Sequence, residues 1–559
     1  MPARRALLIA AILAALAGGC GSDDEGAQTP VAGAVERQLG YLDPRSSAIL
    51  VFDVRFDGPN WKRLREHAER GLAAYREAAP PDAEDVPGSV DEALEELARD
   101  WGELSFADDV APVLDGHLVV GISIPPVEEG AEPEELARTV FAFRTEGEGL
   151  ERLVERLSGE KPKPHPDHDD VKLYAETAVV GGDTLVWAAQ ASDEREALDA
   201  AIRRAKDDGG FPADRLADAE RRAGLDDPFL LAAADPTIAR ALVAEPNLRR
   251  ALDEVPWLGA IRSLTGAVRI DEGGAELAGV VATDEQAVQD ADLPLAPPGD
   301  LDLPRSDAVA GASRDQSFTT TFLSRTVRAL FADSEFAKAV EEAERDLGVR
   351  FEDEVLRQFS CPSMSEMEPG SQRFAARSCV RDPERMRELL PKLSEHLPRI
   401  IRTMQGLDEE GLITLLLIAP DAPLTPSFAP VAQIQVEPAP QEGAAEEETL
   451  YEVTGLRDNA RSEIAGAGPD RVVFGMIGDA FVVASDREMA RRAADFEGDR
   501  LDEPAASAIR APLRSLLGED DTAASAPENA LYDLLGAIEV TASADRAGLK
   551  ARGRLDLGD

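Results

Sequence analysis

The densest group of side chains able to bind a metal ion lies between residues 163 and 170. The sequence there reads Lys-Pro-His-Pro-Asp-His-Asp-Asp, so His165 and His168 stand among three carboxylates. Histidine nitrogens and carboxylate oxygens are both zinc ligands. However, two prolines interrupt the stretch and it joins a helical pattern to a strand pattern, so no rigid element fixes the ligand geometry. We therefore expect a solvated loop at His165 and His168 rather than a metal site.

Motifs of the common enzyme classes are missing from the sequence. It contains no Gly-x-Ser-x-Gly nucleophile turn, no His-Glu-x-x-His zinc motif and no Walker phosphate loop. A Ser-x-x-Lys pattern occurs at 158–161, but Gly159 and Pro162 end the helix that this chemistry requires. Adjacent acidic residues are expected by number alone, because the chain holds 108 Asp and Glu. We predict no catalytic residue, no cofactor and no metal, and hence a protein that is not an enzyme.

One of the three cysteines follows a segment with the layout of a secretory signal. Arg4 and Arg5 precede an apolar run, residues 6–17, that is too short to span a bilayer, and the segment ends in Leu-Ala-Gly-Gly-Cys at 16–20. Small residues directly before a cysteine resemble the lipobox of bacterial lipoproteins, although Ala17 stands where that family usually has a larger aliphatic residue. An ordinary secretory signal followed by a chance cysteine is the alternative.

The lipobox resemblance implies a location for the whole chain. Residues 1–19 would be removed as a signal peptide, and Cys20 would carry the lipid, palmitate among its acyl groups. The chain would then be extracytoplasmic, anchored to the outer face of the bacterial cell membrane. Its membrane contact would be the lipid on Cys20, because no later apolar run is long enough for a membrane helix.

The charge balance excludes one class of partner. Lys and Arg number 59 against 108 acidic residues, which gives a formal net charge of −49. Removal of the signal would take two arginines with it and make the mature chain still more acidic. A surface this negative repels phosphate backbones, so we expect no nucleic-acid partner.

The two remaining cysteines, Cys361 and Cys379, are expected to pair in an oxidising compartment. Cys361 precedes a polar loop with Gly and Pro (362–370), and Cys379 follows a strand-like stretch at 374–377. A bridge across the base of that hairpin would stabilise the fold by roughly 3 kcal/mol in the chain-entropy model. Two free buried thiols and an incomplete metal site are the alternatives.

Hydrophobic patterning divides the chain into two folded parts. The chain of 559 residues is 43% hydrophobic, which is typical of a globular protein of several domains. We predict a flexible acidic tether at 20–38, a first module at 39–290, a Pro-rich linker at 291–302 and a second module at 303–559. Apolar residues at helical spacing predict a helix at 61–77, and alternation around Gly-containing turns predicts hairpins at 264–283 and 472–484.

The second module repeats short patterns of the first in the same order, which predicts an internal duplication. We therefore predict an α+β fold of two tandem modules, each a largely antiparallel sheet covered by helices. The matched segments are 44–48 with 304–308, 141–144 with 374–377, 182–193 with 478–486, and 266–268 with 536–538.

A few of these segments also resemble, loosely, a family of bacterial envelope proteins known only as a domain of unknown function. The resemblance is carried by the opening Leu-Asp-Pro-Arg-Ser-Ser-Ala at 42–48, the strand that ends at Asp53, and the Gly-Asp to Ser-Asp step before a helix. These motifs have low specificity. The resemblance implies a topology and a compartment, and it brings no catalytic residue.

Three functions remain open at this point. The first is a non-catalytic lipoprotein that binds a protein or cell-envelope partner, and the second is a solute-binding lipoprotein with its site between the two modules. The third is a hydrolase with dispersed active-site residues. A shallow, apolar surface patch favours the first, a deep polar cleft between the modules the second, and a carboxylate of strongly raised pKa in such a cleft the third.

Overall fold

The computed structural model describes most of the chain between residues 31 and 557. The described ranges are 31–79, 86–123, 138–174, 176–189, 194–207, 209–235, 246–306, 308–330, 332, 335–368, 373–403, 435–439, 448–454, 471–513 and 534–557. The predicted signal peptide and Cys20 lie outside these ranges, so their assignment stays a prediction.

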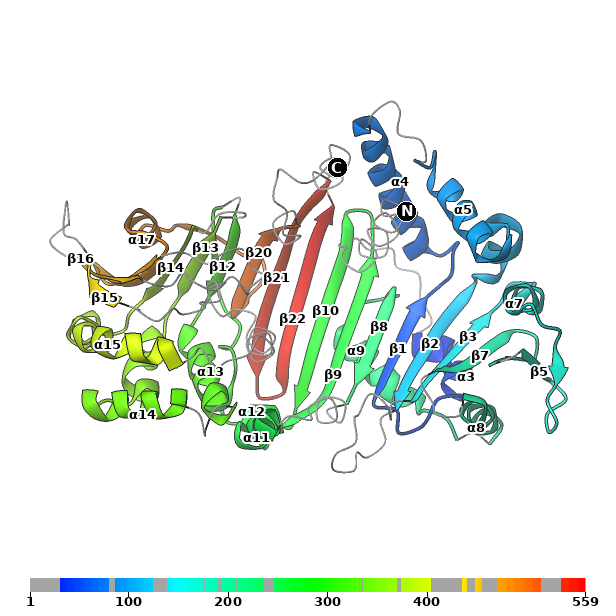
Figure 1. Cartoon of the computed structure of the whole chain (residues 1–559), viewed down its shortest axis with the longest axis horizontal. Coiled ribbons are helices and arrows are strands. Elements are labelled where there is room, and N and C mark those ends of the chain that lie inside the picture. The colour runs from blue at the N-terminus through cyan, green and yellow to red at the C-terminus, as the bar shows by residue number, and fades with distance from the viewer. Residues whose placement is uncertain are drawn as a thin grey trace.

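One antiparallel sheet of twenty strands forms the body of the protein (Figure 1). The strands of its first half are β1 Ala48–Asp53, β2 Gly116–Ser123, β3 Arg138–Thr145, β4 Lys163–Pro164, β5 Val171–Tyr174, β6 Thr177–Val180, β7 Thr184–Ala189, β8 Leu230–Ala234, β9 Ile261–Ile270 and β10 Gly274–Thr283. Those of its second half are β12 Val309–Ser313, β13 Ser363–Met367, β14 Phe374–Cys379, β15 Gln435–Pro438, β16 Glu448–Thr454, β17 Arg471–Ile477, β18 Ala480–Ala484, β20 Ser507–Pro512, β21 Leu535–Asp545 and β22 Gly548–Leu557. A separate two-stranded sheet pairs β11 Asp302–Pro304 with β19 Gly498–Arg500.

The two halves meet edge to edge in the middle of the sheet. Strand β10 pairs with β22 from Gly274 opposite Asp556 to Ala282 opposite Gly548. Each of these strands also forms a hairpin with its predecessor, so β9, β10, β22 and β21 make a central group of four long strands (Figure 1). The predicted α+β class and antiparallel pairing are confirmed. The halves share one sheet, whereas we expected a sheet for each module.

The strand order is the same on both sides of this junction. Outward from β10 the sheet runs β9, β8, β1, β2, β3, β7, β6, β5 and β4. Outward from β22 it runs β21, β20, β12, β13, β14, β18, β17, β16 and β15. Counted within each half, both sequences read tenth, ninth, eighth, first, second, third, seventh, sixth, fifth and fourth strand.

Helices cover both faces of the sheet in the first half, where the strands carry apolar side chains on both sides. The helices that the structure describes are α2 Val31–Ala34, α3 Glu36–Leu39, α4 Pro59–Ala78, α5 Val90–Gly102, α7 Leu150–Ser158, α8 Glu194–Lys206, α9 Ala213–Ala223, α11 Pro246–Glu254, α12 Pro256–Gly259, α13 Gln316–Leu330, α14 Glu335–Leu347, α15 Pro383–Thr403 and α17 Arg487–Ala494. In the first half, Val119 and Val186 pack in one core with residues of α8 and α9. Their neighbours Leu118 and Leu185, which point to the opposite face, pack with residues of α5 and α7.

The folded body begins earlier than the sequence predicts. Residues 31–39 form α2 and α3, and Val31, Val35 and Leu39 are buried in the main core. The backbone N–H groups of Val31 and Ala32 donate to the Glu220 carboxylate on α9, at 2.8 and 3.2 Å. The predicted tether at 20–38 therefore does not extend through its last residues, because an apolar residue at every fourth position gives them a core-facing stripe.

The predicted linker at 291–302 is also packed. Leu293, Leu295 and Leu301 are buried, and each belongs to a hydrophobic cluster. A short 3₁₀ turn, Asp290–Asp292, starts the segment. Three prolines fix the direction of the chain here, while the leucines of the segment face the core. In the part of the chain that the structure describes, none of the helices has the length and apolar character needed to cross a membrane.

Asp271, in the turn of the β9–β10 hairpin, gives a testable electrostatic prediction. Its side chain is buried, its Oδ1 accepts from the Gly273 N–H at 2.9 Å, and its Oδ2 has no partner. Burial raises the pKa of this carboxyl despite the hydrogen bond from Gly273. Because this pKa is higher in the folded than in the unfolded state, the protein loses stability as pH rises through the folded-state pKa.

We therefore expect Asp271→Asn to stabilise the protein at pH 7 by about 1 kcal/mol. The amide oxygen of asparagine can still accept from the Gly273 N–H, and the buried negative charge is removed. Urea unfolding at several pH values measures this. The gain should shrink as pH falls toward 4, where the wild-type carboxyl is protonated too. Glu272→Gln, at the exposed neighbouring position, is the charge-matched control. A gain that does not change with pH would contradict the prediction.

Candidate functional site

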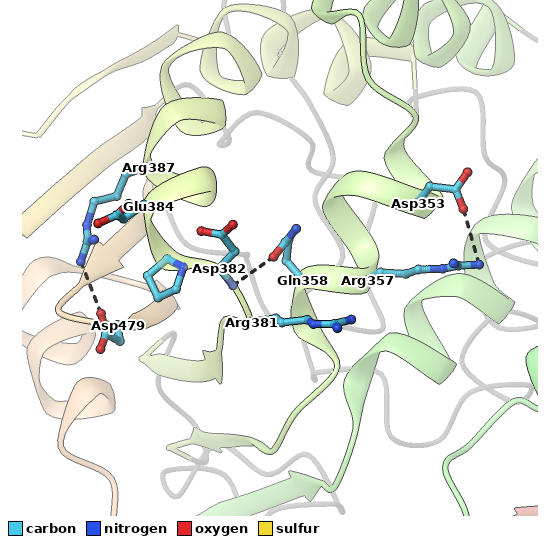
Figure 2. A pocket seen from close by; sticks show the side chains of 9 residues that line it. Asp353, Arg357, Gln358, Arg381, Asp382, Glu384, Arg387 and Asp479 are labelled. Atoms are coloured by element: carbon cyan, nitrogen blue, oxygen red, sulfur yellow. Dashed lines mark hydrogen bonds and ion pairs between the residues drawn. The ribbon is translucent and has the colours of Figure 1, made fainter.

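A polar hollow of about 770 Å³ lies on the second half of the protein (Figure 2). It is open to solvent, and charged side chains of both signs line it. The lining residues are Asp353, Arg357, Gln358, Arg381, Asp382, Pro383, Glu384, Arg387 and Asp479. We call it the α15 pocket, because four of these residues belong to the start of α15 or directly precede it.

Four local structures position the lining. Asp353 belongs to a single π turn, Phe351–Val355, and Arg357 and Gln358 to the 3₁₀ turn Leu356–Phe359. The apolar side chains of these turns, Phe351, Val355 and Phe359, pack against the core of the second half and fix the position of the turns. Helix α15 is held by Met386, Leu389 and Leu390 in the same core. Asp479 comes from the turn between β17 and β18.

Gln358 ties the short turns to the start of α15. Its Oε1 accepts from the Asp382 N–H at 3.1 Å, and its backbone oxygen accepts from the Arg381 N–H at 2.8 Å. The Asp382 carboxylate in turn accepts from the Arg385 N–H at 2.9 Å, so Asp382 caps the helix. Two hydrogen bonds, one to the side chain and one to the backbone of Gln358, therefore fix the 3₁₀ turn relative to the start of α15.

Charged pairs stand at the two ends of the pocket (Figure 2). At one end Arg387 Nη2 lies 3.7 Å from Asp479 and donates to the Gly478 backbone oxygen at 2.5 Å. At the other end Arg357 lies 3.4 Å from Asp353. Asp479 and Arg357 are 88% and 55% exposed, so both pairs can exchange partners at little cost in free energy.

Arg381 lies between these pairs, and Figure 2 shows its guanidinium without a dashed contact to the other lining residues. The side chain is exposed, and among the described residues no hydrogen bond or ion pair engages it. The pocket thus offers an arginine in its centre, carboxylates around it and a helix amino end beside it. Such a lining suits a charged segment better than an apolar small molecule, because small-molecule sites are mostly apolar and enclosed.

The predicted cysteine pair borders this pocket. Cys361 and Cys379 lie at disulfide distance, with Cα atoms 5.8 Å apart. Cys361 follows the 3₁₀ turn that carries Arg357 and Gln358, and Cys379 ends β14 two residues before Arg381. The pairing of Ser363 with Ser378 places the two cysteines at the base of the β13–β14 hairpin, as the sequence predicts.

The His165 and His168 loop has structural contacts of its own. The His165 side chain is 4% exposed, its Nδ1 accepts from the Asp167 N–H at 3.1 Å, and its Nε2 lies 3.4 Å from Asp199 on α8. The two imidazole rings lie 4.8 Å apart. Within the described ranges, no group of His, Cys, Asp and Glu side chains is arranged to hold a metal ion.

A second polar cluster is buried in the first half, around Asp53 at the end of β1. The Asp53 carboxylate accepts from Arg55 Nε at 2.8 Å and from Asn60 Nδ2 at 3.0 Å. Arg55 also bonds Asp227 at 2.8 Å, and the Asn60 side-chain oxygen accepts from the Ile270 N–H at 3.2 Å. Every member of this cluster has a partner, and Asp53 is 1% exposed. We read it as a structural network that joins β1, α4 and β9.

The pocket residues were not singled out by the sequence analysis as a site. The Gly-Asp turn at 478–479 enters the sequence analysis only as part of the repeat. The remaining residues carry no motif, because a lining of ordinary charged side chains is defined by its position alone.

Comparison with known proteins adds little at this point. No family model matches the chain, and no curated protein matches it. Three solved structures that align with it are crystal forms I, IV and III of TP0453. They are 6%, 9% and 6% identical, cover 44 to 46% of this chain and 78 to 81% of theirs, and give TM-scores of 0.22, 0.22 and 0.21. At these scores the likeness carries no argument about fold or function.

Proposed function

We propose that this chain is a non-catalytic, lipid-anchored protein on the outer face of a bacterial membrane, and that its α15 pocket binds a charged segment of a protein or cell-envelope partner. The pocket is the observation that carries the proposal. It is open, its ends hold exposed ion pairs, and Arg381 stands in its centre. Charges of both signs at an accessible surface favour recognition of a complementary charged partner.

The two alternative functions have less support. A solute-binding protein would use a cleft between two lobes, but here β10 and β22 join the halves as neighbouring strands of one sheet. A hydrolase would be favoured by a carboxylate of raised pKa in the pocket. The buried carboxyl with a raised pKa, Asp271, lies instead in a hairpin turn of the other half.

The proposed duplication belongs with this function, because it supplies two related halves of which one carries the pocket. Four segment matches from the sequence support it. Segment 44–48 ends on the first residue of β1, and of segment 304–308 the described residues 304–306 and 308 come directly before β12; 141–144 and 374–377 lie on the third strand of each half. The Gly-Asp turns at 182–183 and 478–479 precede the seventh strand, and 266–268 and 536–538 lie on the ninth.

The anchoring is tested by Cys20→Ala in the full chain. We expect the wild-type protein to sediment with membranes and to take up labelled fatty acid. The variant should lose the label completely, because acylation needs the thiol. Its signal peptide should stay attached, or the chain should be released from the membrane fraction. A wild-type chain that is secreted without lipid would refute the anchor.

The pocket is tested by Arg381→Glu, which reverses the central charge. We expect a crosslinked adduct on intact cells to weaken at least about tenfold, since a close pair of opposite charges at an interface contributes about 1.5 kcal/mol or more. Arg45→Glu, at a 92% exposed side chain in the other half, controls for net charge. Adducts of equal strength in wild type and both variants would rule out the pocket while leaving the anchor intact.

A further inference from the structure

Three basic side chains follow one another on a single face of β22, in the centre of the sheet. They are Lys550, Arg552 and Arg554, at alternate positions of the strand, so they point to the same side. Such a row stands out in a chain with 59 basic and 108 acidic residues. The residues opposite them on the neighbouring strands decide which of the three charges are neutralised.

The charge of Arg554 is balanced within the sheet. Arg554 stands opposite Glu276 on β10 and Glu539 on β21. The same cross-strand line continues to Arg269 and Arg510, which bond these two glutamates at 2.8 and 2.5 Å. Five strands thus present an alternating series of basic and acidic side chains, in which each charge has an opposite neighbour.

Arg552 and Lys550 have no such neighbours. Arg552 stands opposite Ala278 and Thr541, and Lys550 opposite Val280 and Ser543. Among the described residues no carboxylate comes within ion-pair distance of either cation, and the buried Nη1 of Arg552 has no hydrogen-bond acceptor. Asp545, two residues beyond Ser543 on the same face of β21, accepts instead from two backbone N–H groups of the β21–β22 turn at 2.8 and 3.1 Å.

Helix α9 packs beside Arg552 without supplying a counter-charge. Gly224, the residue that ends α9, lies so close that a Cβ atom there would come within 3.1 Å of Arg552 Nη2. The carboxyl end of a helix carries a partial negative charge, which offsets part of the charge of the guanidinium. The helix end does not supply a hydrogen-bond acceptor for Arg552 Nη1, and it does not offset the charge of the exposed Lys550.

We propose that Lys550, Arg552, Thr541 and Ser543 form a binding site for a phosphate group. Cross-strand partners have Cβ atoms about 5 Å apart and alternate residues of a strand lie about 6.7 Å apart, so the four side chains surround one small area of the sheet. An ammonium, a guanidinium and two hydroxyls donate more hydrogen bonds than the two oxygens of a carboxylate accept. A phosphate has the oxygens and the charge to take them.

This site lies on the central strands, apart from the α15 pocket, and it stands whether or not the chain is lipid-anchored. The phosphate group can belong to a soluble phosphate ester or to a lipid headgroup. Both offer the same oxygens to the same donors, so the experiment separates them.

Thermal unfolding of the full chain in phosphate, compared with chloride at the same ionic strength, tests the site. We expect phosphate to raise the unfolding midpoint, because a ligand that binds the folded state stabilises it. In Lys550→Gln and Arg552→Gln the dissociation constant for phosphate should increase at least about tenfold, as expected when a charge-assisted hydrogen bond is lost. Arg45→Gln should respond as wild type does.

Lys550 is exposed, so its replacement tests the site even if Arg552→Gln fails to fold. No phosphate response in wild type, or an equal response in Lys550→Gln, would overturn the proposal. Glycerol phosphate and vesicles of phosphatidic acid, with phosphatidylcholine vesicles as the reference, then identify the source. A Lys550-dependent response to the soluble ester alone assigns a soluble ligand, and Lys550-dependent binding to the phosphatidic acid vesicles assigns a headgroup.

Discussion

Replacing Asp53 by alanine should destabilise the protein by about 3 kcal/mol or more, because it breaks a buried ion pair and removes one acceptor from each of its two partners, Arg55 and Asn60. The Asp53 side chain is fully buried, and Arg55 is 31% exposed. Asn60 would lose one of its two acceptors as well. Urea unfolding of the full chain measures the effect, and Asp57→Ala, at an exposed position in the next turn, is the control.

The same pair predicts a dependence on pH. Burial opposes ionisation of Asp53, but hydrogen bonds from Arg55 and Asn60 outweigh it and lower the pKa of its carboxyl. A carboxyl with a lowered pKa stabilises the fold above its unfolded pKa, and this stability is lost as pH falls through the folded pKa. The difference between wild type and Asp53→Ala should therefore narrow below about pH 4. A variant within about 1 kcal/mol of wild type at pH 7 would show that solvent replaces the carboxylate.

Local patterns predicted the elements of this fold well. The helix predicted at 61–77 is α4, and the two predicted hairpins are β9–β10 and β17–β18. Each depends on neighbours within about twenty residues, where helical spacing or a Gly-containing turn specifies the geometry. The prediction that Cys361 and Cys379 lie together is confirmed for the same reason, since one hairpin brings both residues together.

Pairings between distant segments were not predictable in this way. Gly274 pairs with Asp556 across more than half of the chain, and no local pattern distinguishes an edge strand from one that joins two halves. Asp53 illustrates the same limit at a single residue. It was read as the end of a strand, whereas its role depends on Asn60, Asp227 and the backbone of Ile270.

The N-terminal segment shows a different kind of error. The acidic, Gly-rich composition of residues 21–26 dominated the interpretation of 20–38 as a tether. Val31, Val35 and Leu39 nevertheless stand at four-residue spacing, and all three are buried in the main core. The helical pattern was present in the sequence, but three apolar positions are too few to outweigh the composition of the surrounding segment.

The disulfide gives the second large expected effect, and it links stability to the pocket. Removal of both thiols in Cys361→Ser with Cys379→Ser should lower the free energy of unfolding by about 3 kcal/mol, because the bridge closes a short loop in the unfolded chain. The two residues are 18 apart in sequence. Reductant should cause the same loss in wild type and no further loss in the double variant. This agreement between reduction and substitution separates the bond itself from any effect of the serine side chains.

Loss of the bridge should also weaken binding at the α15 pocket, since one cysteine follows Gln358 closely and the other precedes Arg381. The backbone bond from the Arg381 N–H to the Gln358 oxygen would then hold these two segments with less support. We expect crosslinking to the partner to fall in the reduced protein at temperatures where it is still folded. A wild-type protein whose unfolding midpoint and mass are both unchanged by reductant would show that the two thiols are unbonded, and the pocket would then owe its shape to Gln358 and the underlying core.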